Sequence, residues 1–98
     1  MDIQKSIRMA SDTGNVLFGH NSSVQSITQG KTKLVLIAKN VSNDVMVEVT
    51  KKCKLAEVPY YLFEGTSMEL GSICGKPYPI SVMSVLEEGD SDILELIK

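Results

Sequence analysis

The stretch "KLVLIA", residues 33–38, carries five apolar side chains in a row after its lysine. A strand with one face in water alternates apolar and polar residues, whereas a strand covered on both faces is apolar throughout. We therefore expect a buried strand here, with other elements packed against both of its faces.

Patterns on either side of this strand predict an alternation of helices and strands. Ile3, Ile7 and Ala10 recur at helical spacing, which predicts a helix over residues 3–10. Three further strands are expected, at residues 15–19, 60–64 and 80–88. Two further helices are expected between strands: one capped by Asn21, Ser22 or Ser23 and closed by Gly30, and one at 43–56 capped by Ser42 or Asn43. A short helix should run from Thr66 to about Cys74, and a terminal helix should have Asp90 near its N-cap and Ile93 and Ile97 facing inward.

This order of elements favours one α/β domain over residues 1–98, a three-layer α/β/α sandwich with helices on both faces of a four-stranded sheet. Right-handed crossovers would make the first three strands parallel, so that their carboxyl ends meet at one edge. Ligands of open α/β sheets bind at that edge.

Three loops that follow these strands are rich in small polar residues at predicted helix starts. They are "GHNSSV" from Gly19, "AKNVSND" around Asn40 and "EGTSMEL" from Glu64. Free N–H groups and the positive end of the helix dipole bind phosphate without requiring a basic protein. For any one loop, ordinary capping is the stronger explanation, and Thr66 with Glu69 matches a capping box that needs no ligand. Only the convergence of the three loops favours a ligand.

The segment "FEGTSMELGSICGKPYPI", residues 63–80, concentrates three of the seven glycines and two of the three prolines. Between the prolines it presents Tyr78, preceded by Lys76, on a stiffened loop. An exposed aromatic ring can stack on an unpaired RNA base. A strand residue with a hydrogen-bonded hydroxyl group is the structural alternative for Tyr78.

The composition excludes several classes of protein. The net charge of −2 argues against a protein that binds nucleic acid through overall positive charge. The charge is unevenly distributed, since residues 1–54 hold eight basic and four acidic side chains, whereas residues 55–98 hold two basic and eight acidic ones. We expect Cys53 and Cys74 to be reduced and buried, with no metal site, because the chain has one histidine and no local ligand spacing. No apolar run is long enough for a membrane span, so we expect a cytoplasmic protein.

Four segments together resemble the archaeal and eukaryotic large-subunit ribosomal proteins numbered thirty, within the superfamily of kink-turn RNA binders. They are "G-x-x-S-S-V" at 19–24, "QGKTKLVLIAKN" at 29–40, "YLFEGTSMELGSICGK" at 61–76 and "SVLEEGDSDIL" at 84–94. The resemblance implies a mixed sheet whose fourth strand runs against the others, which brings "GKPYPI" to the same edge as the three loops.

The resemblance also implies roles for single residues. Gly19 would allow close RNA approach, Asn40 would contact RNA, Tyr78 would lie against an extruded base and Ile80 would add an apolar contact. The full expected RNA-binding set is Gly19, His20, Asn21, Ser22, Ser23, Lys39, Asn40, Glu69, Lys76, Tyr78 and Ile80. Asn21 and Val45 stand at positions that can be basic in relatives, so charge-assisted phosphate contacts are expected to be fewer. Lys31, Lys33 and Lys39 are further candidates for phosphates, or are simply solvated.

The resulting hypothesis is a non-enzymatic constituent of the large ribosomal subunit that binds a kink-turn of ribosomal RNA, works in the cytoplasm without a cofactor and is monomeric when free. Two alternatives stay open. One is a kink-turn protein of RNA modification or messenger regulation. The other is a domain that binds a small phosphorylated ligand, which is weakened because no phosphate-binding fingerprint or catalytic motif is present.

Overall fold

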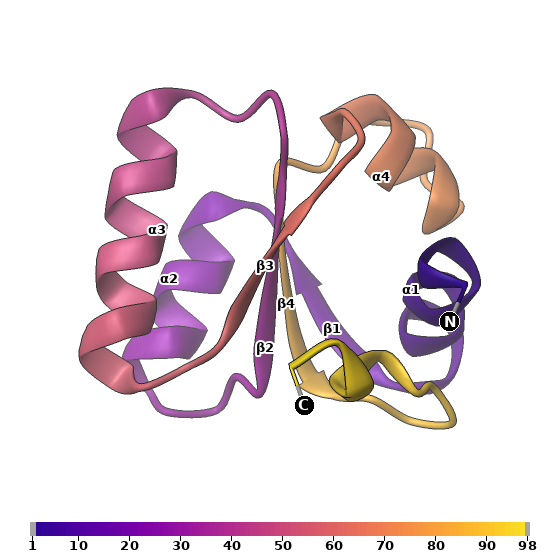
Figure 1. The fold of residues 1–98 in the computed structure, drawn as a ribbon, viewed down its shortest axis with the longest axis horizontal. Coiled ribbons are helices and arrows are strands. Elements are labelled where there is room, and N and C mark those ends of the chain that lie inside the picture. Colours follow the sequence, from indigo (N-terminus) through magenta and orange to yellow (C-terminus); the bar gives the residue numbers. More distant parts are fainter. Residues whose placement is uncertain (1, 98) are drawn as a thin grey trace.

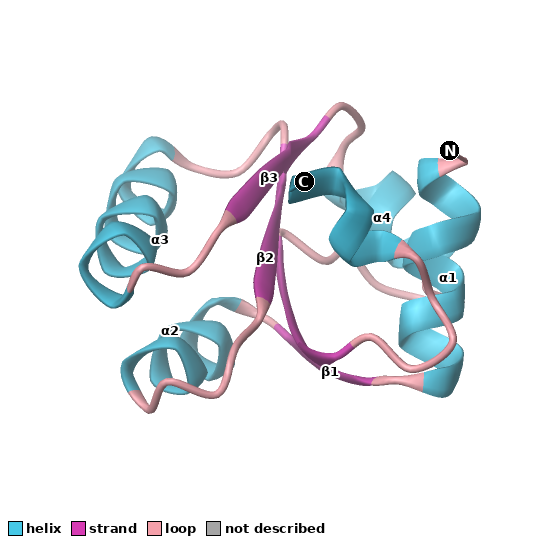
Figure 2. Cartoon of the chain, turned by 60° about the horizontal axis from the view of Figure 1, so that its bottom comes forward, coloured by secondary structure: helices cyan, strands magenta, loops and turns pink. Residues whose placement is uncertain are grey.

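The computed structural model describes residues 2–97, which form a four-stranded sheet with helices on both faces (Figure 1). The elements are α1 (Ile3–Thr13), β1 (Asn15–Phe18), α2 (His20–Thr28), β2 (Leu34–Ala38), α3 (Asn43–Ala56), β3 (Tyr60–Phe63), α4 (Ser67–Ile73), β4 (Val82–Glu87) and the 3-10 helix η1 (Ile93–Ile97). Helices α2 and α3 cover one face, and α1, α4 and η1 cover the other (Figures 1 and 2). The expected α/β/α sandwich is confirmed.

The strand order is β1-β4-β2-β3. Strand β4 pairs antiparallel with β1 and with β2, and β2 pairs parallel with β3. The first three strands are therefore parallel to one another and β4 runs against them, as expected. Their carboxyl ends and the start of β4 lie at one edge of the sheet.

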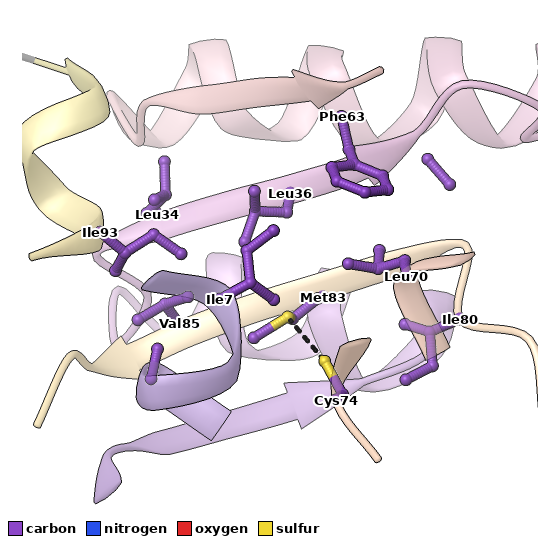
Figure 3. Close-up of a cluster of buried hydrophobic side chains, with 12 residues drawn as sticks. Ile7, Leu34, Leu36, Phe63, Leu70, Cys74, Ile80, Met83, Val85 and Ile93 are labelled. Carbon is purple, nitrogen blue, oxygen red and sulfur yellow. Dashed lines mark hydrogen bonds between the residues drawn. The ribbon is translucent and has the colours of Figure 1, made fainter. Parts of the chain in front are cut away.

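Strand β2 is buried along its whole length, which confirms the interpretation of "KLVLIA". Its side chains alternate between two cores. Leu34 and Leu36 join Ile7, Met83 and other residues beneath α1 and α4 (Figure 3). Val35 and Ile37 join a second core beneath α2 and α3. Because this strand supplies both cores, it holds the three layers together.

Both cysteines are free and buried, as expected. Cys53 belongs to the second core, and the loss of solvation raises the pKa of its thiol from 9.0 to about 11. Cys74 lies in the first core, where its Sγ donates to the Sδ of Met83 at 3.8 Å (Figure 3) and where desolvation raises its pKa. These thiols contribute to packing as small apolar groups.

The predicted start of α2 is wrong. The helix begins at His20, and Gly19 is its N-cap, with φ 102° and ψ 159°. No side chain caps this end of the helix, so none of the three expected residues, Asn21, Ser22 and Ser23, is the cap. A glycine at positive φ turns the chain straight from β1 into the helix. The expected closure at Gly30 is confirmed, since Gly30 has φ 73° and its N–H donates to the carbonyl of Ile27.

The C-terminal segment also differs from the prediction. It is a 3-10 helix, and the hydroxyl group of Ser91 accepts from the N–H of Ile93 at 3.1 Å. Asp90 does not cap it, because Asp90 lies in the preceding turn, where its N–H donates to Oγ1 of Thr13 at 2.9 Å. Ile93 is fully buried, as expected, whereas the side chain of Ile97 lies outside the described part. Ser91 also donates to the carbonyl of Ser6, which fastens this segment to α1.

Candidate functional site

A surface pocket of about 530 Å³ lies at the sheet edge where β1 and β2 end and β4 begins. We call this edge the rim, and define it by the residues that line the pocket: Phe18, Gly19, His20, Asn40, Val41, Ser42, Val45, Tyr78, Pro79, Ile80 and Ser81. Three segments that are distant in the sequence therefore meet here. The structure brings together Gly19, His20, Asn40, Tyr78 and Ile80 from the expected set.

Gly19 gives the rim an uncapped helix start. Its N–H donates to the carbonyl of Val82 at 2.9 Å, which ties the end of β1 to the start of β4. A Cβ at Gly19 would meet no atom within 4 Å, so crowding does not require glycine here. The positive φ does require it. With no side-chain cap, the first N–H groups of α2 are available to an anion at the rim.

Asn40 connects the rim to α4. Its Oδ1 accepts from the N–H of Ser67 at 2.8 Å, and the neighbouring Lys39 N–H donates to the carbonyl of Gly65 at 3.0 Å. These bonds hold the turn after β2 against the turn after β3. The side-chain amide of Asn40 keeps its NH₂ group for another acceptor.

Tyr78 is the most exposed large side chain of the rim, with 48% of its surface accessible. Its loop is held against α4 because the N–H of Lys76 donates to the carbonyl of Gly71 at 2.9 Å and that of Ile80 to the carbonyl of Ser67 at 3.0 Å. The ring is thus displayed on a loop fixed at both ends, as the prolines indicated.

Gly71 permits this arrangement, a role that was not expected from the sequence. It is buried in α4, and a Cβ at this position would lie 2.1 Å from the carbonyl oxygen of Tyr78. Glycine in a helix interior is costly compared with alanine. A glycine inside a helix just before the "CGKPYP" loop therefore indicates that another part of the backbone packs closely against the helix at this position.

Among the described residues, few cations lie near the rim. The Nζ of Lys76 lies 5.3 Å from the centre of the Phe18 ring, a cation–π contact beside the pocket. Lys39 is exposed at the end of β2. Lys33 is at the opposite end of that strand and pairs with Glu87 at 3.1 Å and Glu88 at 3.6 Å. The hydrogen bond that its ammonium group donates to Glu87 raises the pKa of Lys33. Lys33 and its neighbour Lys31 are therefore not phosphate contacts at this rim.

His20 lies at the rim and its Nε2 forms a short contact with a carboxylate oxygen of Glu48 on α3. The His20 and Glu48 side chains are 35% and 48% exposed. The sequence offered no sign of this pair, because the two residues are in different helices.

Six expected residues do not line the pocket: Lys39 and Lys76, described above, and also Asn21, Ser22, Ser23 and Glu69. Asn21 and Ser22 are exposed on the first turn of α2, next to it. Ser23 is fully buried and its Oγ has no partner among the described residues, so its side chain cannot reach a ligand at the surface. Glu69 lines a separate depression with Tyr61 and Gly65. Ile80 lines the pocket but is only 2% exposed, so it belongs mainly to the core.

No helix within residues 2–97 combines the length and the apolar character that a bilayer span requires. The described part also contains no group of three or more His, Cys, Asp or Glu side chains arranged to hold a metal ion.

Comparisons with known proteins agree with this fold. Residues 1–95 match the family described as "Ribosomal protein L7Ae/L30e/S12e/Gadd45 family". The chain is 46% identical over 97 residues to "Large ribosomal subunit protein eL30" of Methanothermobacter thermautotrophicus, with 99% of each chain covered. It is 48% identical over 96 residues to the protein of that name from Methanosphaera stadtmanae, with 98% of each covered.

A solved structure has the same fold at low sequence identity. It is titled "The structure of a protein with unknown function from Bacillus halodurans C", with a TM-score of 0.85 and 21% identity over 98% of this chain and 95% of that one. The match of family and relatives over almost the whole length confirms the resemblance seen in the four sequence segments. The chain belongs to the ribosomal protein L7Ae/L30e/S12e/Gadd45 family.

Proposed function

We propose that this chain is a non-catalytic constituent of the large ribosomal subunit that binds a kinked, internally looped element of ribosomal RNA through the rim. It acts in the cytoplasm as a monomer until it joins the ribosome. The names of its archaeal relatives support the ribosomal assignment.

One observation carries the RNA-binding part of the proposal. The uncapped start of α2 at Gly19, the amide of Asn40 and the half-exposed ring of Tyr78 surround a single pocket. These groups suit three different parts of an RNA: phosphates for backbone N–H groups, base edges for an amide and an unpaired base for an aromatic ring. A straight duplex keeps its bases stacked and cannot use the ring, whereas a kinked internal loop releases bases to it.

The charge distribution predicts how the affinity depends on salt. Lys39 and Lys76 are the lysines near the rim, and Val45 and Asn21 are neutral. Each phosphate neutralised changes the slope of log Kd against log salt by about 0.7 to 0.9. With two lysines the slope should be about 1.4 to 1.8, so shape and stacking must contribute most of the selection.

A titration of labelled RNA tests the proposal directly. The protein should bind a kink-turn RNA far more tightly than a straight duplex of equal length and composition. Equal affinity for the two RNAs would refute recognition of the kink.

Co-sedimentation tests the ribosomal assignment separately. The protein, added to ribosomal subunits stripped of their own copy, should sediment with large subunits and not with small ones. Kink-turn binding without large-subunit association would favour a role in RNA modification or messenger regulation. If neither RNA nor subunits bound, a small phosphorylated ligand would become the better hypothesis.

A further inference from the structure

The contact between His20 and Glu48 joins the rim to a surface that faces elsewhere. His20 lines the pocket, whereas Glu48 lines a depression on the outer side of α3 together with Asp44, Val47 and Lys51. The carboxylate of Glu48 therefore contacts the ring of His20, although Glu48 itself does not line the pocket.

The carboxylate determines which ring nitrogen is left for a ligand. A neutral imidazole has one N–H and one lone-pair nitrogen, and a carboxylate can only accept a hydrogen bond. The contact involves Nε2, so Glu48 favours the tautomer with the proton on Nε2. Nδ1 then remains as a hydrogen-bond acceptor. A carboxylate that fixes a histidine tautomer in this way is a common device around functional imidazoles.

We infer that Glu48 is a positioning residue that holds His20 in the Nε2–H tautomer, so that Nδ1 accepts a hydrogen bond from an RNA donor, a 2′-hydroxyl or a base N–H group. This inference rests on the proposed function, because it names how one rim residue takes part in RNA recognition.

Simple electrostatics predicts the opposite effect for Glu48. A carboxylate near a polyanion repels it, so removal of Glu48 should strengthen RNA binding slightly. Asp44 is an exposed carboxylate on the same side of α3 and shares the depression with Glu48. Asp44→Ala therefore serves as the electrostatic control for RNA binding, and its effect on the first turn of α3 is followed separately by thermal unfolding.

The experiment combines RNA titration with NMR of the imidazole. His20 is the only histidine of the chain, so its ring ¹⁵N signals are unambiguous. At alkaline pH the wild-type ring should show the Nε2–H tautomer, Glu48→Ala should give a mixture, and Glu48→Gln should retain it, because the amide oxygen still accepts from Nε2–H. Thermal unfolding verifies that each variant is folded.

Affinity for the kink-turn RNA should follow the tautomer. Glu48→Ala should weaken binding by the inverse of the fraction of rings that keep the Nε2–H tautomer, which is about 2-fold when half of them keep it. Glu48→Gln should stay close to wild type, and Asp44→Ala should bind equally or slightly more tightly. In a His20→Ala background, Glu48→Ala should no longer weaken binding.

Two results would overturn the inference while leaving the proposed function intact. One is a tautomer that Glu48→Ala does not change, and the other is Glu48→Ala binding as tightly as Asp44→Ala. If the wild-type protein did not bind the kink-turn RNA at all, the proposed function itself would be refuted. The role of His20 in RNA recognition would then be refuted as well.

Discussion

Replacement of Gly71 by alanine should disturb the loop that displays Tyr78. The added Cβ would lie 2.1 Å from the carbonyl oxygen of Tyr78, 3.2 Å from its carbonyl carbon and 3.5 Å from the nitrogen of Ile80. Real Cβ contacts essentially never fall below 3.0 Å, so the oxygen must move by at least the difference, 0.9 Å. The obstacle is backbone, and no change of rotamer can relieve it.

The expected energies follow from two opposing effects. Overpacking costs about 1–3 kcal/mol, and the better helix propensity of alanine returns about 1 kcal/mol. Gly71→Ala should therefore lower the free energy of unfolding by about 1 kcal/mol, with a range of about 0 to 2. Because the loop moves, part of the stacking energy of Tyr78, about 1–3 kcal/mol, should also be lost from RNA binding.

Urea unfolding followed by circular dichroism and anisotropy of a labelled kink-turn RNA measure the two effects. Ser72→Ala, on the exposed side of the same helix, is the matched control and should leave both quantities nearly unchanged. The reasoning is refuted if Gly71→Ala behaves like Ser72→Ala in both assays.

Substitutions at three further positions have defined outcomes. Tyr78→Ala should weaken RNA binding by about 1–3 kcal/mol without unfolding the protein, and Tyr78→Phe should restore most of it, whereas equal Kd values for all three proteins would show that the ring does not stack. Glu57, which has φ 58° at the end of α3, should give about 0.5–1 kcal/mol of added stability when replaced by glycine, and a loss of stability in urea would contradict this. Burial raises the pKa of Cys53 to about 11 from 9.0, so the unfolded chain loses this proton first and stability should fall as pH rises from 9.0 to about 11. In urea titrations, the free energy of unfolding of Cys53→Val should fall less over that pH range than that of the wild type. Identical pH profiles for the two proteins would refute the attribution of this pH dependence to Cys53.

Local patterns were sufficient for most of the elements. Helix α3 matches the predicted range 43–56, because its apolar spacing, the cap at Ser42 and Pro59 beyond its end all agree. The cap is visible as a hydrogen bond from the N–H of Val45 to Oγ of Ser42. The apolar run of β2 predicted the three layers for a similar reason, since no other environment suits five buried residues in succession.

The errors arose where backbone geometry or a distant partner decides the local structure. The preference of Asn21 and Ser22 for cap positions was overridden by Gly19, whose positive φ only the fold reveals. Asp90 was expected to cap a helix, but Thr13, 77 residues away in the sequence, bonds its N–H instead. Helix propensity depends on neighbouring residues in the sequence and cannot predict such a distant contact.

The candidate site was predictable in part. Parallel strands place their carboxyl ends together, so Gly19 and Asn40 could be expected at one edge, and the family resemblance added Tyr78 by reversing the fourth strand. The insertion of β4 between β1 and β2, the contact of Glu48 with His20 and the packing of Gly71 on Tyr78 all depend on tertiary neighbours. Ser23 shows the reverse case, because a polar residue that looked accessible is buried.

The most direct test of the account is a map of backbone amide NMR shifts as kink-turn RNA is added to the ¹⁵N-labelled protein. The largest changes should fall on the amides of residues 18–22, 39–42, 76, 78, 80 and 81, which form or flank the rim. Binding through the rim is contradicted if those amides are unaffected and the changes fall instead on the outer side of α3 or on the acidic segment 87–95.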